Sequence, residues 1–164
     1  DNSLTSIDQD GTDNQVDGSQ AGNLNKILVE QDDTNQYVSA IQSGSSNSLD
    51  STQSGNLNSA YFDQSGTLND VLIVQAGTSN LANIVQSGNG NDLDIDQFGA
   101  DNEVSINQVG DSGIIDVAQT TAGAYAEVNQ SGGTGNEAYV TQGSYDAVSI
   151  ITQVGSSNFA SINQ

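Results

Sequence analysis

The stretch that decides the fold is NDVLIVQAGTSNLANIVQ, residues 69–86. From Asn69 to Gln75, every second residue is an amide or an aliphatic side chain, and the same order returns eleven positions later in the segment that ends at Gln86. Alternation with a period of two is the signature of a strand with one buried face, and a helix would scatter these residues around its surface. The stretch therefore predicts two short strands whose amide and apolar side chains share one face.

The four residues that follow each such Gln are predicted to form a turn. In the turn of residues 76–79, Gly77 lies two positions after Gln75, where a residue without a Cβ atom can adopt a positive φ. The absence of Pro suits central strands, because Pro cannot donate a hydrogen bond to a neighbouring strand. The turn glycines at the equivalent place are Gly11, Gly22, Gly44, Gly55, Gly66, Gly77, Gly88, Gly99, Gly110, Gly132 and Gly155.

The repeat of eleven residues runs through the whole sequence, which is typical of a repeat architecture. Its Gln is found at Gln9, Gln20, Gln31, Gln42, Gln53, Gln64, Gln75, Gln86, Gln97, Gln108, Gln119, Gln130, Gln142, Gln153 and Gln164. Its Asn, six positions before Gln, is found at Asn14, Asn25, Asn47, Asn58, Asn69, Asn80, Asn91, Asn102, Asn136 and Asn158. Gln15 and Gln36 lie outside the Gln series, and one additional residue falls in the turn 131–135. We therefore expect residues 1–164 to form a single domain of fifteen half-repeats.

Several half-repeats depart from this pattern. Ser3, Gly113, Ala124 and Ala147 stand where Asn is expected, and Asp33, Thr121 and Ser144 stand where the turn Gly is expected. Three of these departures fall within residues 113–124, which we expect to be a weaker part of the fold. The additional residue lies in a turn, so the register of the strands should survive it.

Strands this short must share a core, and the economical arrangement is an all-β, two-sheet parallel β-solenoid of the amyloid type. Two half-repeats make one rung of about 22 residues, so the chain forms about 7.5 rungs with odd strands in one sheet and even strands in the facing one. Pairs such as Val71 and Ile73 opposite Ala82 and Ile84 fill a thin core. Stacked every ~4.8 Å, the Asn and Gln amides can bond their equivalents in the rungs above and below. We assign these residues a structural role rather than a catalytic one.

Composition excludes several classes of function. The chain carries 21 acidic residues and one basic residue, Lys26, for a net charge of −20, so nucleic-acid phosphates would be repelled. Without His or Cys, the usual zinc ligands and the usual nucleophile–base pairs are missing. No inserted loops carry paired catalytic groups, and no apolar run reaches the length of a membrane span. We predict no catalytic, cofactor-binding or metal-binding residues.

The start of the sequence suggests export. The chain has no Met and begins with Asp1, which is too bulky a second residue for ordinary removal of an initiator Met. We expect that a secretory leader was removed, and the alternative is that the sequence is a fragment.

The pattern Gln-x-Gly-x-x-Asn-x-Ala-x-x-x-Gln resembles the curlin repeat of bacterial curli fibres. It stands in Gln75–Gln86 as QAGTSNLANIVQ and in Gln153–Gln164 as QVGSSNFASINQ. The resemblance implies a secreted subunit that assembles with itself, head to tail, into an extracellular amyloid fibre for biofilm matrix and adhesion. It also implies two partners, a nucleator subunit and an outer-membrane secretion channel. The scarcity of basic residues favours a major subunit over a nucleator.

Two alternatives remain open at this point. The first is a monomeric or stalk-forming β-solenoid surface adhesin, which would need a capping segment at each end to prevent stacking. The second concerns Asp92, Asp94 and Asp96, which share one outward face and could attract a divalent cation, although a solvated acidic face is the simpler interpretation.

Overall fold

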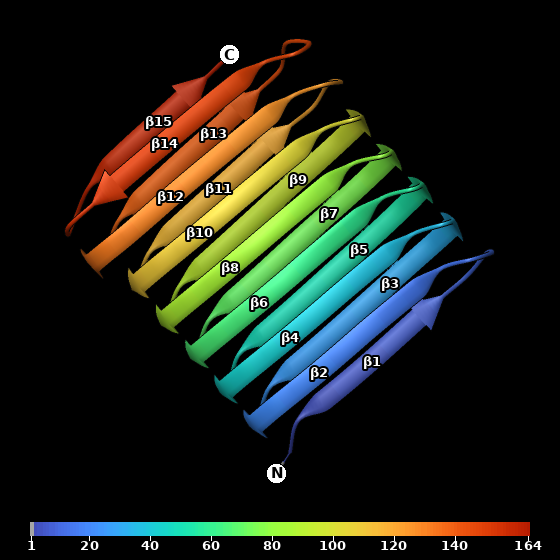
Figure 1. The fold of residues 1–164 in the computed structure, drawn as a ribbon, viewed down its shortest axis with the longest axis horizontal. Coiled ribbons are helices and arrows are strands. Elements are labelled where there is room, and N and C mark those ends of the chain that lie inside the picture. Colours follow the sequence, from blue (N-terminus) through green and yellow to red (C-terminus); the bar gives the residue numbers. More distant parts are fainter. Residues whose placement is uncertain (1) are drawn as a thin grey trace.

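A computed structural model describes residues 2–164, and Figure 1 shows them as a stack of strands with the two termini at opposite ends. The fifteen strands are β1 Leu4–Gln9, β2 Gln15–Asn23, β3 Lys26–Thr34, β4 Tyr37–Ser45, β5 Ser48–Asn56, β6 Ser59–Thr67, β7 Asp70–Thr78, β8 Leu81–Asn89, β9 Asp92–Ala100, β10 Glu103–Asp111, β11 Ile114–Gln119, β12 Tyr125–Thr134, β13 Glu137–Gln142, β14 Val148–Val154 and β15 Phe159–Asn163. The described residues contain no helix.

Consecutive strands alternate between two parallel sheets. The odd strands form an eight-stranded sheet from β1 to β15, and the even strands form a seven-stranded sheet from β2 to β14. Within a sheet, each strand pairs with the strand one rung away, so that Gln53 lies beside Gln75, and Gln75 beside Gln97. Equivalent residues are 22 positions apart, as in the bond between Gln53 and Gln75. The predicted all-β, two-sheet parallel β-solenoid is confirmed.

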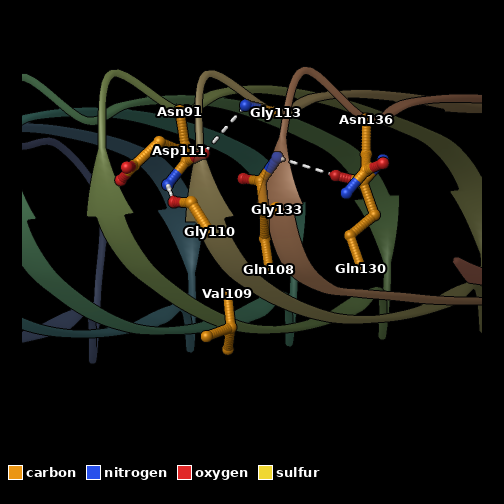
Figure 2. Close-up of a pocket in the computed structure, with 9 residues that line it drawn as sticks. All are labelled: Asn91, Gln108, Val109, Gly110, Asp111, Gly113, Gln130, Gly133 and Asn136. Atoms are coloured by element: carbon orange, nitrogen blue, oxygen red, sulfur yellow. Dashed lines mark hydrogen bonds between the residues drawn. The ribbon is translucent and has the colours of Figure 1, made fainter. Parts of the chain in front are cut away.

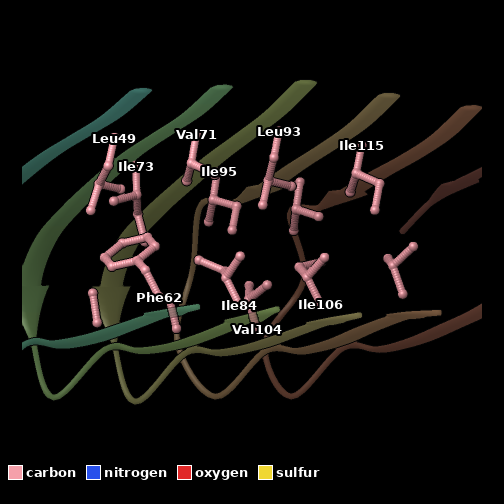
Figure 3. Close-up of a cluster of buried hydrophobic side chains, with 14 of the residues drawn as sticks. Leu49, Phe62, Val71, Ile73, Ile84, Leu93, Ile95, Val104, Ile106 and Ile115 are labelled. Carbon is pink, nitrogen blue, oxygen red and sulfur yellow. The ribbon is translucent and has the colours of Figure 1, made fainter. Parts of the chain in front are cut away.

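The core lies between the two sheets and is one layer of side chains from each. In β7, Val71 and Ile73 are buried, whereas the intervening Leu72 is 42% exposed. Figure 3 shows the inward side chains of the odd strands, such as Leu93, facing those of the even strands, such as Ile106. The small aliphatic side chains predicted for these positions therefore form one continuous core along the stack.

The strands are longer than the sequence pattern predicts. The predicted turn was residues 76–79, but β7 continues through Gly77 to Thr78 and leaves only Ser79 and Asn80 at the corner. The reason is that turn residues also have equivalents directly above and below. Gly77 pairs with Gly55 on one side and Gly99 on the other, so the ladder of hydrogen bonds follows the chain into the bend.

A second left-handed position was missed by the sequence analysis. The residue just before the Asn place has φ near +60°, as at Leu57 (61°) and Leu68 (58°). Asn, Asp and Ser occur at this place as well, and short polar side chains tolerate this conformation better than Leu does. Leu68 is 66% exposed, so packing against neighbouring residues does not explain why Leu occurs at this place.

The additional residue of the turn 131–135 is accommodated between β10 and β12. Val109 pairs with Ser131, but Asp111 pairs with Thr134, which marks the shift. Equivalent residues on either side of it are 23 positions apart, as in the bond from Gln119 to Gln142, whereas Asn136 and Asn158, both after it, are again 22 apart. Inward and outward faces are unchanged, because the shift is completed within the bend.

Two strands are shorter where the turn Gly is replaced. β11 and β13 have six residues each and end at the repeat Gln, whereas the regular strands have nine. Thr121 and Ser144 occupy the Gly place after them, and neither adopts a positive φ. Without that conformation, the chain leaves the sheet at the Gln.

Candidate assembly site

The Gln side chains form two rows of hydrogen bonds along the solenoid. Gln75 is fully buried; its Nε2 donates to Oε1 of Gln97 (2.7 Å), and its Oε1 accepts from Nε2 of Gln53 (2.6 Å). One row runs through Gln9, Gln31, Gln53, Gln75, Gln97, Gln119 and Gln142, and the other through Gln20, Gln42, Gln64, Gln86, Gln108, Gln130 and Gln153. In every bond, the donor lies on the N-terminal side of the acceptor.

Most Gln side chains of the rows also tie the two sheets together. Nε2 of Gln75, in the eight-stranded sheet, donates to the carbonyl oxygen of Ser59 (3.0 Å), the first residue of β6 in the facing sheet. Nε2 of Gln97 makes the equivalent bond to Leu81 (3.0 Å). Both amide hydrogens of the Gln therefore have an acceptor inside the core, which removes the cost of burying them.

The Asn side chains brace the turns instead of forming a second row of the same kind. Nδ2 of Asn69 donates to the carbonyl oxygens of Ser65 (2.9 Å) and Gly88 (2.9 Å), and its Oδ1 accepts from the backbone N–H of Asn91 (3.1 Å). Direct bonds between Asn amides occur only at the pairs Asn47–Asn69, Asn69–Asn91 and Asn136–Asn158 among residues 2–164. Asn is one methylene shorter than Gln, so its amide stays close to the backbone. Amide-to-amide bonding was predicted for both series, and it is the rule only for Gln.

The turn glycines stack on one another. Gly77 has φ +125°, and a Cβ atom added to it would overlap the carbonyl oxygen of Gly99 in the next rung. The same approach occurs at Gly44 and Gly66. Of the three residues that replace this Gly, Asp33 alone keeps a positive φ (81°), and its carboxylate accepts a hydrogen bond from the backbone N–H of Gly55 (3.0 Å).

Gln36 takes the place of an Asn, which the sequence analysis overlooked. It is buried, and its Nε2 donates to the carbonyl oxygens of Asp32 (2.6 Å) and Gly55 (3.1 Å), as an Asn does in other turns. Its Oε1 is buried without a hydrogen-bond partner. The signal was available, because Gln36 lies six positions before Gln42.

The series of Asn residues is interrupted at Gly113. Its backbone N–H donates to Oδ1 of Asn91 (2.9 Å), but Gly113 offers no side chain to continue the series to Asn136. Figure 2 shows Gln108 and Gln130 beside the small pocket that this leaves. A Cβ atom on Gly113 would lie 2.6 Å from Nε2 of Gln108 and 3.0 Å from Oε1 of Gln130, so both amides lean into the vacated space.

The neighbouring Gln makes an additional bond where Ala replaces Asn. At the corners formed by Ala124 and Ala147, Nε2 of Gln119 and of Gln142 donates to the carbonyl oxygen of the Ala (3.0 Å each). These bonds hold the Gln amide at the corner, but they do not reach the turn carbonyls that an Asn side chain would bind.

Gly113→Asn is expected to stabilise the solenoid by about 1 kcal/mol, the net value of a typical hydrogen bond. The new amide can accept from the backbone N–H of Asn136, once the flexible amides of Gln108 and Gln130 move back. We expect slower hydrogen exchange of the Asn136 backbone amide and a higher denaturant midpoint in the Gly113→Asn variant. Gly113→Ala is the matched control, since it adds Cβ without the amide; an equal gain from both variants would contradict the proposed bond.

The end rungs leave backbone groups unpaired. The N–H of the first residue in a strand donates to the carbonyl oxygen at the Asn place one rung further, as from Glu137 to Asn158 (2.8 Å) and from Tyr125 to Ala147 (2.8 Å). For Val148 and Phe159, which begin the last strand of each sheet, residues 2–164 supply no such acceptor. Core side chains are also uncovered here, since Ile7 in β1 is 45% exposed.

Carboxylates gather on the outer face of the eight-stranded sheet. Asp70 pairs in register with Asp92, and Asp94 with Asp116. Partial burial raises the pKa of Asp94, and the charges of Asp96, Asp116 and Asp92 raise it further. Burial and then the charge of Asp116 raise the pKa of Asp96. Within residues 2–164, no three His, Cys, Asp or Glu side chains are arranged to hold a metal ion.

Asp94→Asn is expected to stabilise the solenoid at pH 7, with a benefit that shrinks as the pH falls. A carboxyl with a raised pKa in the folded state destabilises the fold while it is charged, and this penalty disappears as the pH falls through the folded-state pKa. The stability difference is measured from the denaturant midpoints of wild type and Asp94→Asn between pH 7 and pH 3. Asp63→Asn is the control, because its register neighbours, Ile41 and Val85, are uncharged. A constant difference between wild type and Asp94→Asn at every pH would contradict the prediction.

An all-β stack with parallel sheets and buried amide rows belongs to the class of solenoid repeat proteins, in which each repeat contacts only its neighbours. A family model described as the curlin associated repeat matches residues 44–77 and 69–99. Residues 44–99 therefore match the curlin repeat that the resemblance in the sequence indicated. Neither the curated proteins nor the solved structures compared with the chain give a match. No helix in residues 2–164 is long and apolar enough to cross a membrane.

Proposed function

We propose that this chain is the structural, non-catalytic subunit of an extracellular curli-type amyloid fibre that grows by adding copies head to tail. The observation that carries the proposal is the state of the end rungs. The core and the Gln rows continue up to them, and the outer edges of β1, β2, β14 and β15 have no partner strand within residues 2–164.

The physical argument is that an open strand edge is a template for another strand. Unpaired N–H and C=O groups on a flat parallel edge favour pairing with a second copy. Because the two ends differ, the contact joins one end to the other and does not close into a ring, so it propagates as a filament. Ile7, an inward residue of β1 that is 45% exposed, adds to the driving force.

The match of residues 44–99 to the curlin associated repeat supports the remaining parts of the proposal. A curlin-repeat protein is expected outside the cell, in biofilm matrix and in adhesion, with a nucleator subunit and an outer-membrane secretion channel as partners. The net charge of −20 keeps separate copies apart before assembly, and it disfavours nucleic acid as a partner.

The test is to follow the purified chain from a freshly dissolved state by electron microscopy and X-ray diffraction. Fibres are expected, with strands perpendicular to the fibre axis and a reflection at ~4.8 Å along it. Growth should accelerate with added salt at pH 7, because salt screens the repulsion between copies. A chain that stays monomeric for weeks at high concentration would overturn the proposal and favour the surface adhesin instead.

A further inference from the structure

The number of strands determines how two copies can meet. The chain alternates between the sheets, and β1 and β15 both belong to the eight-stranded sheet. A solenoid continued beyond β15 therefore places its next strand in the seven-stranded sheet, beside β14. That strand must run parallel to β14, whereas β1 of the same copy runs in the opposite direction (Figure 1).

We propose that successive copies in the fibre are related by a rotation of about 180° about the fibre axis. A half-turn moves β1 of the next copy over β14 and reverses its direction, so that the two strands are parallel. It also brings β2 of the next copy beside β15. Both sheets then run through the junction without a missing strand. This inference rests on the proposed function, since it concerns copies within a fibre of this fifteen-stranded unit.

The alternative without rotation leaves a gap at every junction. If β1 of the next copy paired with β15, β14 and the next copy's β2 would lie two strand spacings apart in the other sheet. Each junction would then bury unpaired backbone groups and open the core on one side. Buried backbone groups without partners are rare in folded proteins, which favours the rotated arrangement.

The Gln rows match across the rotated junction. The repeat places Gln9 of the next copy beside Gln153, and its Gln20 beside Gln164. Every Gln in the rows donates towards the C-terminal end, as Gln130 does to Gln153 (2.8 Å), so Gln153 presents its Nε2 and Gln9 presents its Oε1. At the junction, the donor Nε2 of Gln153 therefore faces the acceptor Oε1 of Gln9 of the next copy.

The corner residues match as well. Oδ1 of Asn136 accepts from the backbone N–H of Asn158 (3.1 Å), and no residue of 2–164 lies above Asn158 to use its own Oδ1 in the same way. In the rotated junction, the residue above Asn158 is Asn14 of the next copy. Its backbone N–H continues the bonding pattern of the regular turns, and its Nδ2 already braces its own turn at the carbonyl oxygen of Asp10 (3.0 Å).

The core continues across the junction as well. Inside the junction, Ile7 of the next copy comes to lie over Ile151, which continues the core. Fifteen half-rungs at ~4.8 Å per rung give a rise of about 36 Å per copy and a repeat of about 72 Å.

A unique cysteine can test the rotation, because the chain has none of its own. Asp70→Cys places a thiol on the exposed outer face of the eight-stranded sheet, at the start of β7. Fibres of this variant are labelled with maleimide-linked gold clusters and imaged by electron microscopy. The expected result is gold on alternating sides of the fibre, with successive clusters about 36 Å apart along the axis.

The matched control removes one half-repeat, residues 81–91, from the same variant. The remaining fourteen strands end in the sheet opposite to β1, so copies can stack without rotation and all gold should lie on one side, about 34 Å apart. Gold on one side in fibres of the full chain would overturn the rotated junction and leave the proposed fibre function intact. Failure of the full chain to form fibres would overturn both. A reconstruction of unlabelled fibres distinguishes the two junctions as well, because the turn 131–135 marks each copy.

Discussion

Gly77→Ala is expected to lower the free energy of unfolding by about 3 kcal/mol or more. A left-handed conformation costs a non-Gly residue about 1–2 kcal/mol, and Gly77 has φ +125°. The added Cβ would also overlap the carbonyl oxygen of Gly99, a backbone atom that is fixed by its own rung. Asp33 occupies the same place with φ 81°, which is closer to the left-handed region that short polar side chains tolerate than the +125° of Gly77.

The denaturant midpoint at which fibres dissolve measures this effect, and Gly18→Ala is its control. Gly18 has no positive φ, and a Cβ atom there meets nothing within 4 Å. It also occupies an inward place beside Ala40, so the added methyl should be neutral or stabilising. A similar loss for both variants would mean that stacking of the turn glycines is not what matters.

Gln75→Ala is the second variant with a large expected effect. It removes the acceptor of Gln53, the donor to Gln97 and the bond to the carbonyl oxygen of Ser59 in the facing sheet. A buried polar group left without a partner costs about 1–3 kcal/mol, and the lost side chain adds a cavity. We expect a total loss of about 3 kcal/mol, together with faster hydrogen exchange in the adjoining rungs.

The control for this variant is Gln15→Ala. Gln15 is an exposed residue of β2 outside the repeat series, and its amide donates only to the carboxylate of Asp17 (3.0 Å). Its removal should change stability by less than about 0.5 kcal/mol. If the two substitutions shifted the dissolution midpoint equally, the Gln row would not be a main source of stability.

The period of the sequence was sufficient to predict the architecture. A strand with one buried face can place Val71 and Ile73 inward only if its register is kept, and the recurrence of Gln every eleven residues fixes that register in each half-repeat. The two-sheet arrangement follows because a single sheet of such short strands would leave its apolar face exposed to water. Fold and sheet membership were therefore accessible from spacing alone.

The details of the corners were not accessible in the same way. The spacing identified Asn69 but not its bonds, because Asn and Gln carry the same amide and differ only in reach. The left-handed place at Leu68 has no residue preference strong enough to be read from one sequence. Gln36 was overlooked because it was classified by residue type instead of by its place in the repeat.

The one-way direction of the Gln bonds has an electrical consequence. Each amide carries a dipole, and in both rows Nε2 faces the C-terminal end, as in the bonds from Gln53 to Gln75 and from Gln42 to Gln64. Aligned dipoles add, as they do along an α-helix, so one end of the stack is electropositive and the other electronegative. The two tips of a fibre then present different chemistry to an incoming copy and grow at unequal rates. A molecule that offers only acceptor groups would cap one tip and leave the other free to elongate.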